Sequence, residues 1–124
     1  MVDGGVDMAS DWARPVVHFE IRAKDPDLVS RFYAELFSWD IGQGFIRAIP
    51  AGIGGPENGI AGHISTSSEP GVTIYVQVKD LASSAARAIE LGGSVTFERM
   101  DIPNGPSLAG IRDPEGNLVT LVQQ

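Results

Sequence analysis

The sequence predicts a single α+β domain made of two tandem βαβββ units, whose strands form one curved, eight-stranded mixed sheet with the helices on its outer face. Two observations carry this prediction. Segments 16–23 and 72–78 both alternate apolar and polar residues, and each precedes an aspartate-capped amphipathic helix and further short apolar segments. We place a flexible tail at residues 1–13 and the domain at residues 14–124, with repeat units at about 15–67 and 71–124.

The first unit begins with a strand that is buried on one face only. In segment 16–23 apolar residues recur at every second position, with polar residues between them. Asp25 and Pro26 then start a helix, because Asp accepts hydrogen bonds from first-turn N–H groups and Pro has no N–H to leave unpaired. Apolar residues at every fourth position from Leu28 to Leu36 predict about three helical turns. Three strands are expected next, around residues 39–41, 45–49 and 60–65, with a Gly/Pro-rich flexible loop at 50–56.

The second unit repeats this plan after a Ser/Pro/Gly linker at residues 67–71. The alternating segment 72–78 is followed by Asp80, which caps an Ala-rich helix that Gly92 and Gly93 end. Strands are expected near residues 95–100, 108–112 and 118–123, with a type I turn starting at Asp113 between the last two.

A shift of the chain by 55 residues supports a duplication. The order of elements, the helix caps and the strand phases all agree between the two units, and agreement at several levels is stronger than any single match. The aligned pairs are Lys24-Asp25 with Lys79-Asp80, Glu35-Leu36 with Glu90-Leu91, and His18 with Thr73.

Composition limits the partners and the compartment. The chain has no Cys, which excludes disulfides, thiolate metal sites and cysteine nucleophiles and fits a reducing cytoplasm. Its net charge of −7 would repel phosphate backbones and anionic membranes, so we expect no nucleic-acid partner and no membrane partner. No signal-peptide pattern and no apolar run of bilayer length is present, and we expect a cytoplasmic protein.

The strand phases also predict which side chains face away from the helices and could line a cleft. In the closing strand at 118–123 the phase stays ambiguous, because both faces are apolar apart from Thr120. The candidates for the cleft face are His18, Glu20 and Arg22 from the first strand, His63 with Ser65 from segment 60–65, Thr73, Tyr75 and Gln77 from segment 72–78, and Thr120.

Four stretches of the chain resemble the vicinal oxygen chelate superfamily, which includes glyoxalase I, bleomycin-resistance proteins and extradiol dioxygenases. They are V-H-F-E-I-R-A-K-D at 17–25, R-F-Y-A-E-L-F-S-W at 31–39, V-Q-V-K-D-L at 76–81 and D-P-E-G-N-L-V-T-L at 113–121. The resemblance covers nearly everything from residue 16 to residue 124. It implies paired βαβββ units around a concave cleft for a small organic molecule, and it implies a homodimer.

The resemblance further implies that metal-dependent members hold one divalent ion (Zn, Ni, Mn or Fe) with four side chains. The matching positions here are His18, Thr73, Thr120 and, depending on the register, either His63 or Gly62. Neutral hydroxyls are poor ligands for such ions, so His18 and His63 are the candidate metal ligands and absence of a cofactor is the favoured expectation. The resemblance also implies a glutamate at the position of Thr120 in the metal-dependent members, where it would serve glyoxalase-type chemistry as a base, and its replacement by Thr argues against glyoxalase I activity.

Three functional hypotheses remain open on this sequence. The first is a small-molecule-binding protein of the glyoxalase/bleomycin-resistance type that lacks a complete metal site. The second is an enzyme, either a metal-dependent lyase, isomerase or dioxygenase-like protein using His18 and His63, or one that uses His18 or Glu20 as a metal-free general base. The third is a protein that keeps the fold only for association. Glu20 and Arg22 have the simpler interpretation of pairing with neighbours across the sheet.

Overall fold

The structure is a computed structural model, and it describes residues 12–51 and 59–124. The part of the expected N-terminal tail up to residue 11 lies outside the described residues, as do residues 52–58, which include most of the expected Gly/Pro-rich loop. The described chain contains two helices and one seven-stranded sheet.

The second unit has the predicted order of elements, and the first has the same order without the strand expected around residues 39–41. The first consists of β1 (Val16–Ala23), α1 (Pro26–Phe37), β2 (Ile46–Ile49) and β3 (Gly62–Thr66). The second consists of β4 (Gly71–Gln77), α2 (Leu81–Glu90), β5 (Ser94–Asp101), β6 (Ser107–Arg112) and β7 (Leu118–Gln123).

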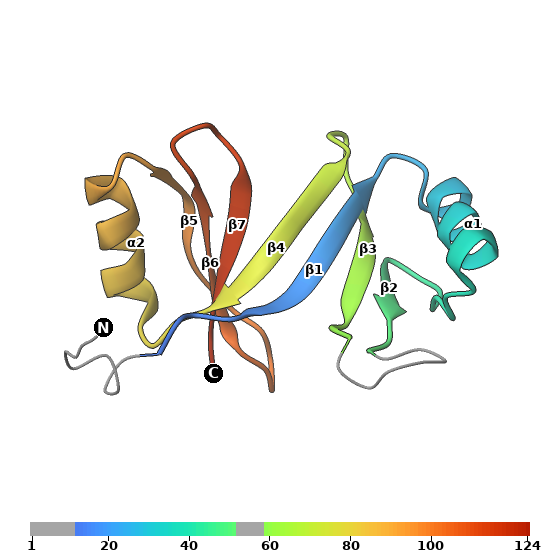
Figure 1. Cartoon of the computed structure of the whole chain (residues 1–124), viewed down its shortest axis with the longest axis horizontal. Coiled ribbons are helices and arrows are strands. Elements are labelled where there is room, and N and C mark those ends of the chain that lie inside the picture. Colours follow the sequence, from blue (N-terminus) through green and yellow to red (C-terminus); the bar gives the residue numbers. More distant parts are fainter. Residues whose placement is uncertain (1–11, 52–58) are drawn as a thin grey trace, which may run out of the picture.

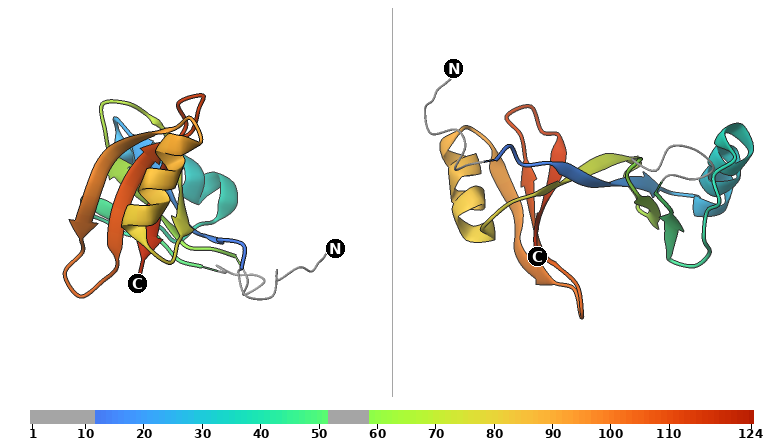
Figure 2. Two further views of the ribbon diagram at one scale, coloured as in Figure 1. Left: turned by 90° about the vertical axis from the view of Figure 1, so that its left-hand side faces the viewer. Right: turned by 60° about the horizontal axis from the view of Figure 1, so that its bottom comes forward.

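The two units form one open mixed sheet because their first strands pair with each other. The strand order is β2-β3-β1-β4-β7-β6-β5. In each unit the last strand runs parallel to the first, and the remaining strands add in antiparallel fashion. The antiparallel pair of β1 and β4 therefore occupies the middle, with α1 and α2 at opposite ends of the molecule (Figure 1). Seen from its end, α2 lies across the strands of its own unit (Figure 2).

The register of β1 against β4 agrees with the duplication. His18 lies opposite Tyr75, and Glu20 lies opposite Thr73. The 55-residue shift makes His18 equivalent to Thr73 and Glu20 equivalent to Tyr75, so a local twofold axis between the two strands exchanges the pairs. Duplication thus places four equivalent positions next to one another on one face of the sheet.

The eighth strand, expected around residues 39–41, is not formed. Ser38 ends α1 in the left-handed conformation (φ 59°), and Trp39 and Ile41 pack as side chains against the core of the first unit. Only the N–H of Gly42 pairs with β2, donating to the carbonyl of Ala48 at 3.0 Å. One hydrogen bond does not make a ladder, so the segment crosses the position of the missing edge strand without extending the sheet.

The predicted N-caps of both helices and the predicted turn before β7 are confirmed. Asp25 and Asp80 accept hydrogen bonds from the N–H groups of Leu28 and Ser83, respectively, three residues into their helices. In the turn before β7, the N–H of Gly116 donates to the carbonyl of Asp113 at 2.9 Å, which is the bond of a four-residue turn.

The helix-facing side of the sheet holds two small cores, one for each unit. The core of the first unit is built on Ile21, Ala23, Ile49 and Ile64, with rings from α1 and Trp39 packed against it. The core of the second is built on Val78, Leu81, Ala109 and Leu121. Each helix covers only its own unit, so the continuous sheet is what joins the two cores.

Substitution of Gly62 by Ala should test how tightly the first core is packed. A Cβ at residue 62 would lie 2.5 Å from ring atoms of Phe19, so the ring or the strand must move. We expect a loss of about 1–3 kcal/mol in the free energy of unfolding, measured by urea denaturation. Gly42→Ala is the matched control, because its Cβ would meet nothing closer than 3.4 Å. Equal losses in the two variants would contradict the packing of Phe19 against Gly62.

Candidate functional site

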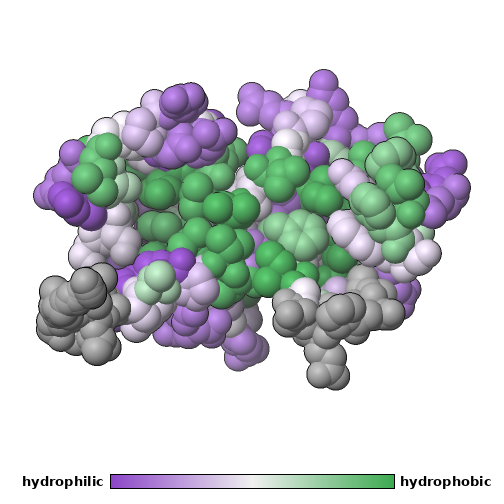
Figure 3. Space-filling model, in the orientation of Figure 1, coloured by the Kyte–Doolittle hydropathy of each residue, from purple (hydrophilic) through white to green (hydrophobic). Residues whose placement is uncertain are grey.

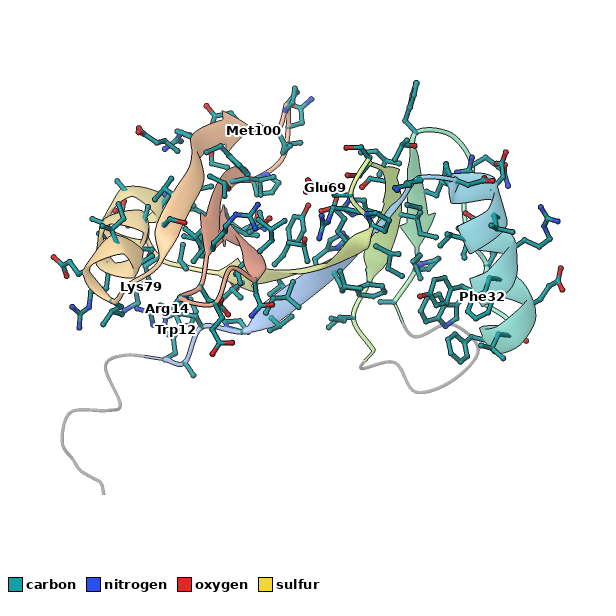
Figure 4. All side chains as sticks on the ribbon, turned by 90° about the horizontal axis from the view of Figure 1, so that it is seen from above. Trp12, Arg14, Phe32, Glu69, Lys79 and Met100 are labelled. Atoms are coloured by element: carbon teal, nitrogen blue, oxygen red, sulfur yellow. The ribbon has the colours of Figure 1, made fainter. Side chains whose placement is uncertain are left out.

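The face of the sheet away from the helices encloses a cleft of about 630 Å³. Side chains from both units of the chain line it. Its polar wall comes from β1, β3, β4 and β7, and its apolar wall comes mainly from β5, β6 and the turn between them. The lining consists of Val17, His18, Glu20, Ile46, His63, Ser65, Tyr75, Phe97, Met100, Ile102, Pro106, Leu108, Thr120, Val122 and Gln124. Figure 4 shows Met100 and Phe32 of α1 on opposite sides of the sheet.

A chain of hydrogen bonds runs along the polar wall. Nε2 of His18 lies 2.7 Å from Nδ1 of His63, whose Nε2 lies 3.2 Å from Oε2 of Glu20. The hydroxyl of Ser65 donates to the same carboxylate oxygen at 2.7 Å. An ionised carboxylate can only accept, so His63 donates to Glu20 through Nε2. In the tautomer with one hydrogen on each ring, Nδ1 of His63 accepts from Nε2 of His18, and Nδ1 of His18 keeps a free lone pair.

Strand register brings these side chains together. Glu20 on β1 lies opposite His63 on β3, and Ser65 is two residues further along the same face. The register also resolves the choice between His63 and Gly62. Gly62 is buried on the helix side against Phe19, whereas His63 lines the cleft.

The protonation states of the polar wall follow from its contacts. The hydrogen bond from His63 lowers the pKa of Glu20, assisted by Ser65, and outweighs the opposing effect of burial. Burial lowers the pKa of His18, and nearby His63 adds to this while Glu20 opposes it. Near neutral pH the wall therefore holds an ionised carboxylate and a neutral His18.

Tyr75 lies between this chain of hydrogen bonds and the second unit. Its ring packs edge-on against that of His18, with centroids 5.0 Å apart, and its hydroxyl is hydrogen-bonded to Thr120. Burial raises the pKa of Tyr75 to about 12, so the phenol stays neutral. Tyr75 therefore contributes a neutral, oriented hydroxyl at the centre of the cleft.

Six of the nine side chains predicted for the cleft face line the cleft together, and three do not. The six are His18, Glu20, His63, Ser65, Tyr75 and Thr120. Arg22 lies outside the lining, where its Nη1 donates to the carbonyl of Glu69 at 3.0 Å and its Nε is buried without a hydrogen-bond partner among the described residues. Thr73 is buried beneath the surface, and Gln77 is half-buried outside the lining.

Sequence reasoning missed the apolar wall. Phe97 and Met100 are three residues apart on β5, yet both line the cleft, while Val95 packs beside α2. The cause is a pair of register shifts in the pairing of β5 with β6, one on either side of Phe97. Such bulges redirect side chains, so a period-two pattern cannot assign this strand to faces. Leu108 and Val122, opposite each other on β6 and β7, complete the wall.

The four positions that the resemblance assigns to metal ligands hold two imidazoles and two hydroxyls. The imidazoles of His18 and His63 are hydrogen-bonded to each other, and the hydroxyl of Thr120 is hydrogen-bonded to Tyr75. Oγ1 of Thr73 is buried without a hydrogen-bond partner in the described part of the chain. Within residues 12–51 and 59–124, no three His, Cys, Asp or Glu side chains are arranged to hold a metal ion.

The fold and the cleft define a two-unit α+β protein with an open concave sheet. The sequence matches the family model of the glyoxalase-like domain over residues 18–122, and the chain therefore belongs to that family. This places it in the vicinal oxygen chelate superfamily, as the resemblance implied. None of the curated proteins compared with the chain matches it.

Solved structures share the fold at low sequence identity. A glyoxalase/bleomycin resistance protein/dioxygenase superfamily member from Vibrio splendidus is 14% identical with a TM-score of 0.64, and the match covers 90% of this chain and all of that one. Methylmalonyl-CoA epimerase from Mycobacterium tuberculosis is 17% identical with a TM-score of 0.59, covering 87% of this chain and 86% of that one. A variant of the Streptomyces coelicolor epimerase, in complex with 2-nitronate-propionyl-CoA, is 18% identical with a TM-score of 0.56, covering 88% of this chain and 96% of that one.

In the described residues, neither helix has the length and apolarity needed to cross a membrane.

Replacement of Thr73 by Val should stabilise the protein. The change removes a buried hydroxyl that lacks a hydrogen-bond partner among the described residues and keeps the side-chain shape, so we expect a gain of about 1 kcal/mol. Thr120→Val is the matched comparison, and it should cost about 1 kcal/mol because Tyr75 loses its partner. Chemical denaturation of both variants measures the difference. A loss of stability in Thr73→Val equal to that in Thr120→Val would mean that this hydroxyl has a partner after all.

Proposed function

We propose that this protein binds a small organic molecule in the cleft between its two units, without a complete four-ligand metal site. The observation that carries the proposal is one half-open cleft in which a hydrogen-bonded polar wall faces an apolar wall. A volume of about 630 Å³ is in the range of pockets that hold drug-sized ligands, which runs from roughly 300 to 1,000 Å³. Support also comes from fold neighbours, one of which is solved in complex with methylmalonyl-CoA.

The donor set argues against a complete metal site. Zn²⁺ and similar ions prefer imidazole, thiolate and carboxylate, and two of the four matching positions offer only threonine hydroxyls. The facing ring nitrogens, Nε2 of His18 and Nδ1 of His63, also share one hydrogen bond, in which one nitrogen donates and the other accepts with its lone pair. We infer that these residues do not fit the four-ligand site of the metal-dependent relatives. A weaker site that uses His18 and His63, with Glu20, is the competing proposal.

A second candidate function is a metal-free enzyme in which His18 moves a proton. The observation that favours it is the chain from Glu20 through His63 to His18, in which a carboxylate orients one imidazole and that imidazole orients the next. A base oriented in this way is a common element of proton-transfer sites. The free Nδ1 of His18 would be the group that takes the proton.

Ligand screening with a blocked cleft would test the binding proposal. Molecules that bind the native protein raise its melting temperature, and we expect Met100→Trp to abolish these shifts by filling the cleft. Met100 is 50% exposed, so the larger ring should not unfold the protein. Leu91→Trp, at an exposed position after α2, is the matched control. Retention of every shift in Met100→Trp would place binding elsewhere.

The same preparations can separate the three chemistries. Metal content measured by mass spectrometry on untagged protein should be far below one ion per chain, and near-stoichiometric metal that is lost in His18→Ala would favour the metal-dependent alternative. A ligand recovered chemically changed, with the change lost in His18→Ala while binding persists, would favour the metal-free enzyme.

A homodimer in the cytoplasm completes the proposal. On the helix side of the sheet the middle strands are uncovered, and Val72 and Ile74 of β4 are 61% and 40% exposed between the two cores. Figure 3 shows apolar side chains across the middle of this face. Exposed apolar patches of this kind mark interaction sites, and the absence of Cys fits the cytoplasm.

Sedimentation should detect the dimer at micromolar concentration, and Ile74→Lys should shift it to monomer because a charge at this position opposes burial. Thr96→Lys, at an exposed position on β5, is the control for added charge. A native protein that sediments as a monomer at this concentration would contradict the proposed homodimer.

A further inference from the structure

The geometry points to a ligand class: we propose that the cleft selects amphipathic molecules whose polar end is a protonated amine, and that it disfavours carboxylates and phosphates. This inference rests on the proposed function, because it names the chemistry of the ligand at the same site. Three observations carry it: the charges around the cleft, the direction of its hydrogen bonds and the character of the opposite wall.

The charge inventory is one-sided. Of the lining residues only Glu20 carries a fixed charge, and no Lys or Arg is among them. The nearest guanidinium along the chain, that of Arg22, acts on Glu20 electrostatically but lies outside the lining and donates to the carbonyl of Glu69. Without a cation inside the cleft, an anionic ligand would face a carboxylate with no compensating partner.

The remaining basic side chains near the cleft are engaged elsewhere. Arg47 pairs with Asp27 at 2.8 Å, and Arg99 pairs with Asp101 at 2.9 Å. Arg14 and Lys79 gather around Trp12, on the other side of the sheet from Met100 (Figure 4). None of these groups is placed to meet a ligand anion in the cleft.

The hydrogen bonds around Glu20 leave two acceptors free and use the hydrogens of the three side chains beside it. Ser65 and His63 both spend their hydrogens on Oε2 of Glu20, and His18 spends its Nε2 hydrogen on His63. Oε1 of Glu20 takes part in no hydrogen bond among the described residues, and Nδ1 of His18 keeps its lone pair. Two unused acceptors on one wall match a ligand group that donates, and an ammonium donates in several directions.

The opposite wall explains why the ligand must also be apolar. Phe97, Met100 and Leu108 face this wall of acceptors across the cleft and offer no hydrogen-bonding group apart from the weak Met thioether. A ligand with an aliphatic or aromatic body against this wall buries apolar surface, while its charged end meets Glu20. The aromatic ring of Tyr75 at the centre adds a further surface that a cation can approach.

Three probes with the same apolar body and different charge test the inference: phenylbutylamine, phenylbutanol and phenylbutyrate. Isothermal titration at neutral pH should give the amine a dissociation constant roughly ten-fold lower than that of the carboxylate, with the alcohol between them. Glu20→Gln should reduce this preference to less than about two-fold. Glu98→Gln, which removes the same charge at an exposed position beside α2, should leave it unchanged.

A second variant covers the case in which Glu20→Gln fails to fold. Met100→Lys adds a cation at a half-exposed position in the lining, and it should turn the preference toward the carboxylate. Binding of phenylbutyrate as tight as that of the amine to the native protein, with binding lost in Met100→Trp, would overturn the inference and leave the proposed function standing. Failure of all three probes to bind would overturn both.

Discussion

The antiparallel pairing of β1 with β4 is the constraint on which the rest of the structure depends. Among the residues that the structure describes, it is the only junction between the two units within the sheet, and each helix covers only its own unit. Apolar and polar residues alternate along both strands. Apolar side chains of the two strands therefore meet on the helix side of the sheet, and polar side chains meet on the cleft side. A one-residue slip of either strand would put His18 or Tyr75 into the core, so burial fixes the register that builds the site.

Duplication supplies a symmetric frame, and the cleft depends on how the two halves have diverged. The face of the first unit carries Glu20, His63 and Ser65, which form a self-contained hydrogen-bonded group. The corresponding half of the second unit carries Val122 and Leu108 instead, together with Phe97 brought round by the bulges. By the same twofold relation Ser65 corresponds to Val122, which is one exchange of a polar for an apolar side chain, and the bulges in β5 supply most of the remaining apolar wall. A symmetric cleft of either kind would lose the ability to orient a ligand end to end.

The sequence predicts the parts of this arrangement that depend on local pattern. Alternation predicted β1 and β4, and the caps at Asp25 and Asp80 predicted both helix starts. The prediction of an edge strand at residues 39–41 was wrong. Trp39 and Ile41 pack their side chains against the core of the first unit, and the segment does not pair as a strand with the edge of the sheet. The chain from Glu20 to His18 depends on the long-range pairing of β1 with β3, which no local pattern specifies.

The state of Glu20 shows how internal donors decide what a cleft can bind. Carboxylates in proteins are commonly neutralised by Lys or Arg, and a ligand cation must then compete with that partner. Here the carboxylate accepts hydrogen bonds from His63 and Ser65 and is paired with no Lys or Arg among the lining residues, so we expect its negative field to remain available to a ligand. At 4 Å and an effective dielectric constant of 20, a unit charge pair interacts by about 4 kcal/mol before desolvation is subtracted. The same field repels an anion. Even a small part of this interaction energy that survives desolvation therefore separates cationic from anionic ligands, whereas the apolar wall contributes equally to the binding of both.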